Sequence, residues 1–103
     1  MMNKAYKMSD TCDMMLSKDW KERFVAEHIQ LLIRLKRLND VVGDYYAGRL
    51  TNMPEAEIMC LLWQHHAMLS YHDAMIYRAK QANIELPSSF EDYYFDTPAK
   101  KAE

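Results

Sequence analysis

Apolar residues recur at steps of three, four and seven along residues 54–83 of this chain. Residues at these spacings lie on one side of an α-helix, one turn or two turns apart. They form three parallel rows: Ile58, Leu61, Met68 and Met75; Leu62, Leu69 and Ile76; and, between them, His65, His72 and Ala79. The pattern predicts one long amphipathic helix over about residues 54–84.

An earlier stretch has the same period. Its apolar seam steps alternately by four and three, which is heptad-like spacing, and consists of Phe24, His28, Leu31, Leu35, Leu38, Val42 and Tyr45. Asp19 followed by Glu22 is typical of a capped helix start, and Gly48 suits the position just after a helix end. We therefore expect a helix over residues 19–47. Gly43 lies inside it, where we expect a close approach by a neighbouring backbone or ring.

The connection between these helices, residues 49–53, is short, and Pro54 suits the first turn of the second helix. Short connections place helices side by side and antiparallel. If the loop centres near residues 50–51, facing residues have numbers that sum to about 101. His28 is then expected to lie level with His72.

The apolar rows are too wide for one hairpin to cover, and small chains of this kind usually need another stabiliser such as oligomerisation. The sequence therefore predicts an all-α fold: a long antiparallel two-helix hairpin that assembles into a homo-oligomeric helical bundle. The residues expected at the interface are Phe24, Leu32, Leu62, His65, Leu69, His72 and Ile76.

The 103 residues have room for one small domain. Residues 1–18 have no clear period and are expected to be flexible or to form a short helix near residues 11–16. The hairpin occupies residues 19–86. Residues 87–103 form a tail in which aromatic residues lie among acids, and this tail is expected to dock either on a partner or on its own bundle.

The charges exclude some classes of partner. The net charge is −2; residues 85–103 carry five acids and two lysines, and residues 19–83 carry eight acids and eight bases. No basic stripe follows either helix, so duplex nucleic acid is not expected as a ligand. No apolar run has the length of a membrane span or signal peptide. The only cysteines, Cys12 and Cys60, are expected to be free thiols in a reducing cytoplasm.

Catalysis and metal binding have little support. His65 and His72 are two turns apart, about 10.5 Å along a helix axis, so they cannot bind one ion in one chain. We interpret the histidines as core residues hydrogen-bonded to Tyr, Asn or each other, in some cases across a subunit interface. The alternative is a binding pocket lined by neutral imidazole. The sequence contains no glycine-rich phosphate loop and no recognisable nucleophile–base pair. We expect no enzyme activity, no metal and no cofactor.

One group of side chains has the chemistry of a ligand site. Arg34 and Arg37 lie one turn apart and, by the pairing above, near the level of three residues of the second helix: Trp63, Gln64 and His66. Arginine forks bind phosphate, and aromatic faces stack on bases. The alternative is a solvated charged flank, with Trp63 in the core or an interface.

Residues 19–86 resemble a family of small phage and prophage proteins related to a crAss-like phage protein. The resemblance rests on the start at residues 21–27 and on a second-helix pattern: Gln64, Ala67, Met68, Tyr71, Arg78, Ala79, Ile84 and Leu86. It implies a phage accessory protein that acts in the bacterial host cytoplasm. It supplies no catalytic residues to transfer.

Through this resemblance, and by analogy with other small phage proteins, we expect a non-enzymatic counter-defence protein, a sponge that sequesters a nucleotide-derived host immune signal. Two alternatives stay open. One is a protein that binds and inhibits a host defence protein, in the manner of an anti-CRISPR. The other is a structural or assembly factor of the phage.

Overall fold

The computed structural model describes residues 5–86 and 94–95 of the chain. These residues are predominantly helical, as predicted. In chain order they form β1 (Ala5–Tyr6), the 3-10 helix η1 (Met8–Thr11), α1 (Cys12–Met15), α2 (Trp20–Tyr46), α3 (Glu55–Gln81) and β2 (Tyr94–Phe95). The two long helices have 27 residues each, which corresponds to a length of about 40 Å.

Both long helices begin and end close to the predicted residues. The Asp19 carboxylate accepts a hydrogen bond from the Lys21 backbone N–H at 3.0 Å and caps the start of α2. Helix α3 ends at Gln81, three residues before the predicted end at residue 84. Asn83 there adopts a left-handed backbone conformation, with φ 56°.

The same backbone motif ends both helices. Gly48 follows α2 with φ 76°, and the Arg49 N–H donates to the Asp44 carbonyl at 2.8 Å. After α3, the Ile84 N–H donates to the Ala79 carbonyl, also at 2.8 Å. A left-handed residue followed by this backward hydrogen bond is the Schellman motif, which satisfies carbonyl groups that the helix leaves unpaired.

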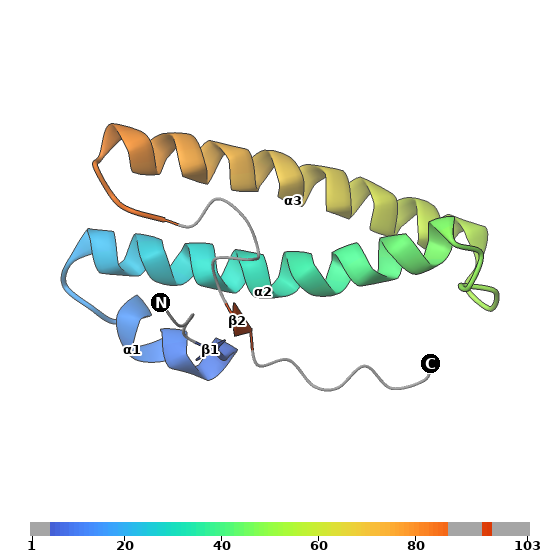
Figure 1. Ribbon diagram of the computed structural model, residues 1–103, viewed down its shortest axis with the longest axis horizontal. Helices are drawn as coiled ribbons and strands as arrows, with labels where there is room; N and C mark the ends of the chain where they lie inside the picture. Colours follow the sequence, from blue (N-terminus) through green and yellow to red (C-terminus); the bar gives the residue numbers. More distant parts are fainter. Residues whose placement is uncertain (1–4, 87–93, 96–103) are drawn as a thin grey trace.

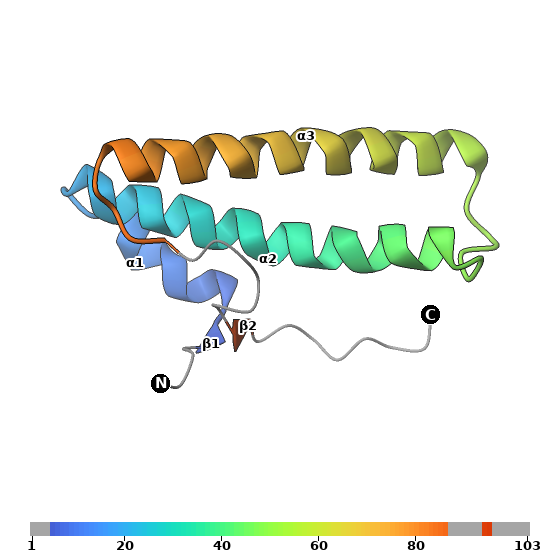
Figure 2. The same cartoon turned by 45° about the horizontal axis from the view of Figure 1, so that its top comes forward.

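Helices α2 and α3 lie side by side and run in opposite directions (Figures 1 and 2). The short segment of η1 and α1 packs on α2 from another side, so that α2 is the central element (Figure 2). One apolar cluster joins α2 to α3 and contains Phe24, Leu31, Met75 and Ala79, with Met68, Ile84 and Leu86 packed against it. A second contains Ile29, Leu32 and Ile33, with Met14 and Val25 alongside.

The N-terminal segment is held to α2 by polar contacts as well as by Met14. The Thr11 side chain is fully buried; its hydroxyl donates to the Met8 carbonyl at 2.6 Å and accepts from the Gln30 amide at 2.7 Å. The Arg23 guanidinium also donates to the Ser17 carbonyl at 2.7 Å. The short helix α1 coincides with the turn of helix expected there.

Two backbone segments far apart in sequence meet beside this region. β1 pairs with β2 in parallel, with Ala5 opposite Tyr94 and Tyr6 opposite Phe95. The tail expected over residues 87–103 otherwise lies outside the described residues. No helix within residues 5–86 is both long enough and apolar enough to cross a membrane.

The two long helices differ in how fully they are covered. Within the described part of the chain, α2 buries ten side chains, whereas α3 buries only Met75 and Ala79. The physical reason is position: α2 has neighbours on more than one side, whereas the main packing partner of α3 among the described residues is α2. One whole face of α3 is therefore left at the surface.

Candidate binding face of α3

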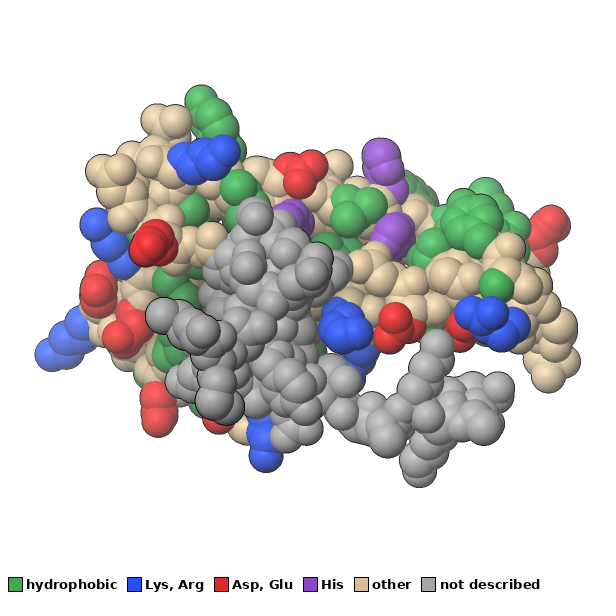
Figure 3. All heavy atoms as spheres, in the orientation of Figure 1, with side chains coloured by type: hydrophobic (Ala, Val, Ile, Leu, Met, Phe, Trp, Pro, Cys, Tyr) green, Lys and Arg blue, Asp and Glu red, His purple; other side chains and the backbone are tan. Residues whose placement is uncertain are grey.

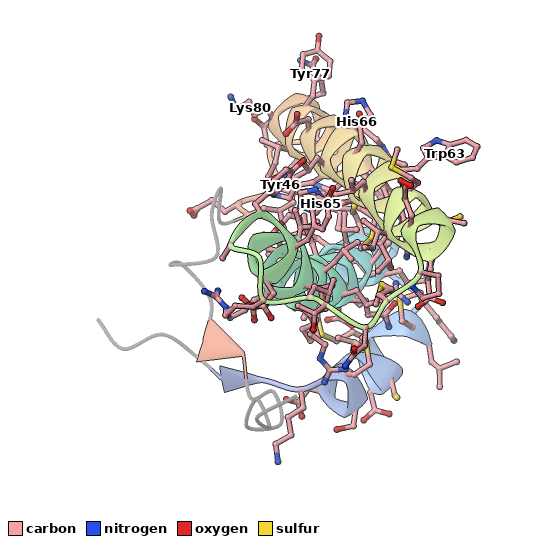
Figure 4. The ribbon with its side chains drawn as sticks, turned by 90° about the vertical axis from the view of Figure 1, so that its right-hand side faces the viewer. Tyr46, Trp63, His65, His66, Tyr77 and Lys80 are labelled. Atoms are coloured by element: carbon pink, nitrogen blue, oxygen red, sulfur yellow. The ribbon has the colours of Figure 1, made fainter. Side chains whose placement is uncertain are left out.

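The exposed face of α3 carries large apolar and aromatic side chains. Trp63 is 77% exposed, Tyr77 65% and Met59 58%, and His66 is exposed beside them. Trp63, His66 and Tyr77 project outward from the molecule (Figure 4). Hydrophobic side chains and histidines gather along α3 in the space-filling view (Figure 3). Exposed apolar groups clustered in this way mark binding surfaces in soluble proteins.

The inner face of α3 carries the other two histidines of the helix. The His72 ring stacks on His28 of α2, with 5.6 Å between ring centroids and 28° between planes. His65 Nε2 and Asn39 Oδ1 form a hydrogen bond. These contacts confirm that His28 lies level with His72 and that these histidines belong to the interior. No group of three metal-ligating side chains occurs in residues that the structure describes.

The predicted ligand site is not assembled within one chain. His65 and Asn39 face each other between the helices. Trp63 and Arg37 each precede one of these contact residues by two positions, which is about 200° around a helix. Both side chains are exposed, and Trp63 points away from α2 (Figure 4). Arg37 and Trp63 lie near the same height along the hairpin, as predicted, but their side chains face opposite outer surfaces of the molecule.

The other members of the predicted ligand site are also exposed. Arg34 lies on the surface of α2, and His66 and Gln64 lie on the surface of α3. The Gln64 amide nitrogen is 3.8 Å from the Met68 sulfur, one turn along the same helix. The five side chains therefore do not converge on one site within a single chain.

The residues predicted at an interface between copies divide into two groups. Phe24 and Leu32 are buried inside their own chain, and their place at an interface between copies stays a prediction. His65 and His72 contact α2, as described above. Leu62 and Ile76 are half-buried and Leu69 is 40% exposed, so these three form a flank of α3 that a partner could cover.

The sequence reasoning missed a row of residues on the outer face of α3. We call it the outer stripe, and it consists of Ala56, Cys60, Trp63, Ala67, Ser70, Ala74 and Tyr77. All seven are exposed, and they follow one another by alternate steps of four and three. This is the spacing of a helix–helix seam. The signal was present in the sequence, but the small residues hid it beside the larger leucine and methionine rows.

The charges of α3 are separated along its length. Glu55 and Glu57 lie in its first turn, and Arg78 and Lys80 lie in its last turn. Acids near the N-terminus and bases near the C-terminus of a helix interact favourably with the helix dipole and stabilise the helix. The Arg78 guanidinium also lies over the Phe24 ring of α2, 4.8 Å from its centroid. The outer stripe thus runs between an acidic end and a basic end.

Comparison with known proteins places the chain in a family. No curated protein and no solved structure matches it significantly. A family model described as Sequestin matches residues 18–81, which is more than half of the chain. The match contains all of α2 and α3 and stops at the last residue of α3. The chain belongs to the Sequestin family.

Proposed function

We propose that this protein is a non-enzymatic sponge that captures a nucleotide-derived signal of host immunity. In this proposal it is encoded by a phage and acts in the bacterial host cytoplasm. The observation that carries the proposal is the Sequestin match across both long helices, because the name of the family fits a sequestering role. A sponge breaks no bonds, so it requires binding surfaces and no catalytic groups.

The exposed side chains supply the chemistry that a nucleotide requires. The exposed rings of Trp63 and Tyr77 offer stacking surfaces for a base, and His66 offers a polar edge. Arg34 and Arg37 offer guanidinium groups for phosphates. Base stacking on an aromatic side chain contributes about 1–3 kcal/mol, and charged hydrogen bonds about 1.5–3 kcal/mol each.

Oligomerisation is part of the same proposal. Useful capture of a signal needs roughly nanomolar affinity, or about −12 kcal/mol, and tight ligand sites enclose most of the ligand surface. The outer face of α3 in one chain is open, and Arg37 and Trp63 face opposite surfaces. A second copy of the two-helix unit would close the site.

Calorimetry against a panel of cyclic dinucleotides and ADP-ribose derivatives tests the proposal. We expect one ligand class to bind with nanomolar affinity and to be released chemically intact when the protein is heat-denatured. Arg34→Ala and Arg37→Ala should each weaken binding by about 10- to 150-fold, the equivalent of one charged hydrogen bond. Lys21→Ala is the matched control, since it removes an exposed cation from the start of the same helix.

Two results separate the parts of this proposal. Absence of binding across the whole panel contradicts the sponge. Nanomolar binding that neither arginine substitution alters keeps the sponge and moves its site elsewhere on the molecule.

A second candidate is an inhibitor that binds a host defence protein. It is favoured by the size of the apolar side chains on the outer face of α3, since exposed Trp63 and Met59 resemble the anchors of protein interfaces. Co-purification of one stoichiometric host protein, lost on Trp63→Ala, together with no binding in calorimetry, would favour this candidate.

A further inference from the structure

We infer that the outer stripe of α3 is a self-association surface, on which a second copy lays its own α3 antiparallel about a two-fold axis near Ala67. The inference concerns how two chains meet and not which ligand they hold. The pairing covers the rings of Trp63 and Tyr77, so it agrees with the proposed ligand site only where the ligand binds at the rim of the stripe. The cross-linking experiments below and the calorimetry above can fail separately.

The first argument is the match of large to small residues. A two-fold axis at Ala67 places each residue opposite one whose number makes a sum of about 133–134, with Ala67 opposite itself. The stripe residue nearest to Trp63 is then Ser70 of the second copy, and the one nearest to Tyr77 is Ala56, each within one residue of the opposite level. Both large side chains of the stripe meet small ones, and these pairings recur symmetrically on the other side of the axis.

The small residues set the distance between the helices. Ala67 and Ser70 lie at the centre of the pairing. On either side of them, Cys60 of one copy contacts Ala74 of the other. Small side chains allow helix axes to approach to about 8 Å, the lower end of the usual range. The alternating steps of four and three keep the stripe facing a partner helix along its whole length, about 32 Å from residue 56 to residue 77.

The second argument is charge. An antiparallel partner brings Glu55 and Glu57 in the first turn of one α3 next to Arg78 and Lys80 in the last turn of the other. The same contact occurs at both ends of the pair, and the two helix dipoles are opposed. A parallel pairing would instead place acids against acids and bases against bases. The charges therefore favour the same orientation as the large-to-small match.

The third argument is the area available. Two copies of a stable complex bury roughly 800 Å² each. Trp63 and Tyr77 are both mainly exposed, and one aromatic side chain can bury about 150–250 Å². Met59 and the small residues of the stripe add to this. His66 is about 100° around the helix from Ala67, so it stays at the rim and open to a ligand.

Disulfide trapping tests both the surface and the register. The exposed thiols Cys12 and Cys60 are first removed by Cys12→Ser and Cys60→Ser. In that background Ala67→Cys places one thiol per chain on the two-fold axis, and we expect oxidation to convert most of the protein into a covalent dimer. Ser70→Cys is the matched control on the same stripe. Its two thiols would lie about 9–10 Å apart along the helix axis, so it should stay uncross-linked.

The pair of variants distinguishes the orientations. A parallel pairing places every stripe residue opposite itself, so Ser70→Cys would cross-link as well as Ala67→Cys, and that result would overturn the antiparallel register. Failure of Ala67→Cys to cross-link would overturn the surface itself.

Sedimentation of charge variants gives a readout without cysteines. Ala67→Glu places two carboxylates face to face on the axis, so we expect it to convert the assembly to smaller species while circular dichroism shows unchanged helicity. Leu69→Glu introduces the same charge two residues away, on the flank chosen from the sequence. Dissociation by Leu69→Glu but not by Ala67→Glu would assign the interface to that flank and refute the stripe. A wild-type protein that is monomeric at micromolar concentration would refute both.

Discussion

At the scale of single residues, Thr11 contributes more to the fold than its exposed neighbours. It is fully buried, and its hydroxyl joins the Met8 carbonyl to the Gln30 amide, at 2.6 and 2.7 Å. Gln30 belongs to α2, so this hydroxyl fastens the N-terminal segment to the central helix. Buried polar groups are costly when they lose their partners.

Thr11→Val should therefore destabilise the protein, because valine keeps the shape of the side chain but cannot hydrogen-bond. We expect a loss of about 1–3 kcal/mol in the free energy of unfolding, measured by urea denaturation. Thr11→Ser retains the hydroxyl and serves as the control, with a smaller loss from the missing methyl group. Equal losses in both variants would show that packing and not hydrogen bonding holds the segment.

At the scale of elements, Gly43 and Gly48 look alike in sequence and have opposite roles. Gly43 lies within α2, and among residues 5–86 a Cβ added there would meet nothing within 4 Å, so the close approach expected from the sequence is not made by this part of the chain. Gly48 also has open space, but its φ of 76° lies in the region where a side chain causes strain.

The two alanine substitutions should therefore differ in sign. Gly43→Ala should raise the free energy of unfolding by about 0.5–1 kcal/mol, since glycine is that much poorer inside a helix. Gly48→Ala should lower it by about 1–2 kcal/mol, the cost of left-handed backbone for other residues. Chemical denaturation of both variants measures the difference. If Gly43→Ala destabilises instead, a second copy occupies the space beside it.

The helices could be predicted from the sequence because their apolar periods are long and their ends carry specific signals. Asp19 and Gly48 mark the limits of α2, and the short connection set the pairing that brings His28 against His72. The docking of the N-terminal segment could not be predicted, since residues 1–18 have no period. Its main polar contact joins Thr11 to Gln30, nineteen residues away.

The direction of the candidate site residues could not be predicted for a different reason. Helix α3 has apolar residues on almost every side, so hydrophobicity alone does not identify the face that meets α2. The contact of His65 with Asn39 decides it, and that hydrogen bond leaves no signal in the spacing of apolar residues. The sequence therefore predicts the level of Trp63 along the hairpin but not the side of α3 on which its ring lies.

At the scale of the whole molecule, the fold has one central helix and one helix covered on a single side. The covering of α2 explains how so small a chain can bury an apolar core, and the open face of α3 is the surface that both proposals use. The end of α3 contributes to the core as well. Ile84 and Leu86 pack against the cluster of Phe24, Leu31, Met75 and Ala79, just beyond the last helical turn.

Two truncations should separate this contribution from that of the tail. A chain ending at Pro87 keeps Ile84 and Leu86 and loses the β1–β2 pair, which contains two residues on each side. We expect its helicity and thermal stability to be nearly those of the full chain.

A chain ending at Asn83 also loses two half-buried side chains and the Ile84 N–H that closes the end of α3. Its free energy of unfolding should fall by about 2–3 kcal/mol, since a fully buried aliphatic side chain contributes about 1.5–3 kcal/mol. Thermal melts followed by circular dichroism compare the three chains. A large loss of thermal stability in the chain ending at Pro87 would show that the tail belongs to the core. Equal stability of the two truncated chains would show that Ile84 and Leu86 contribute nothing to it.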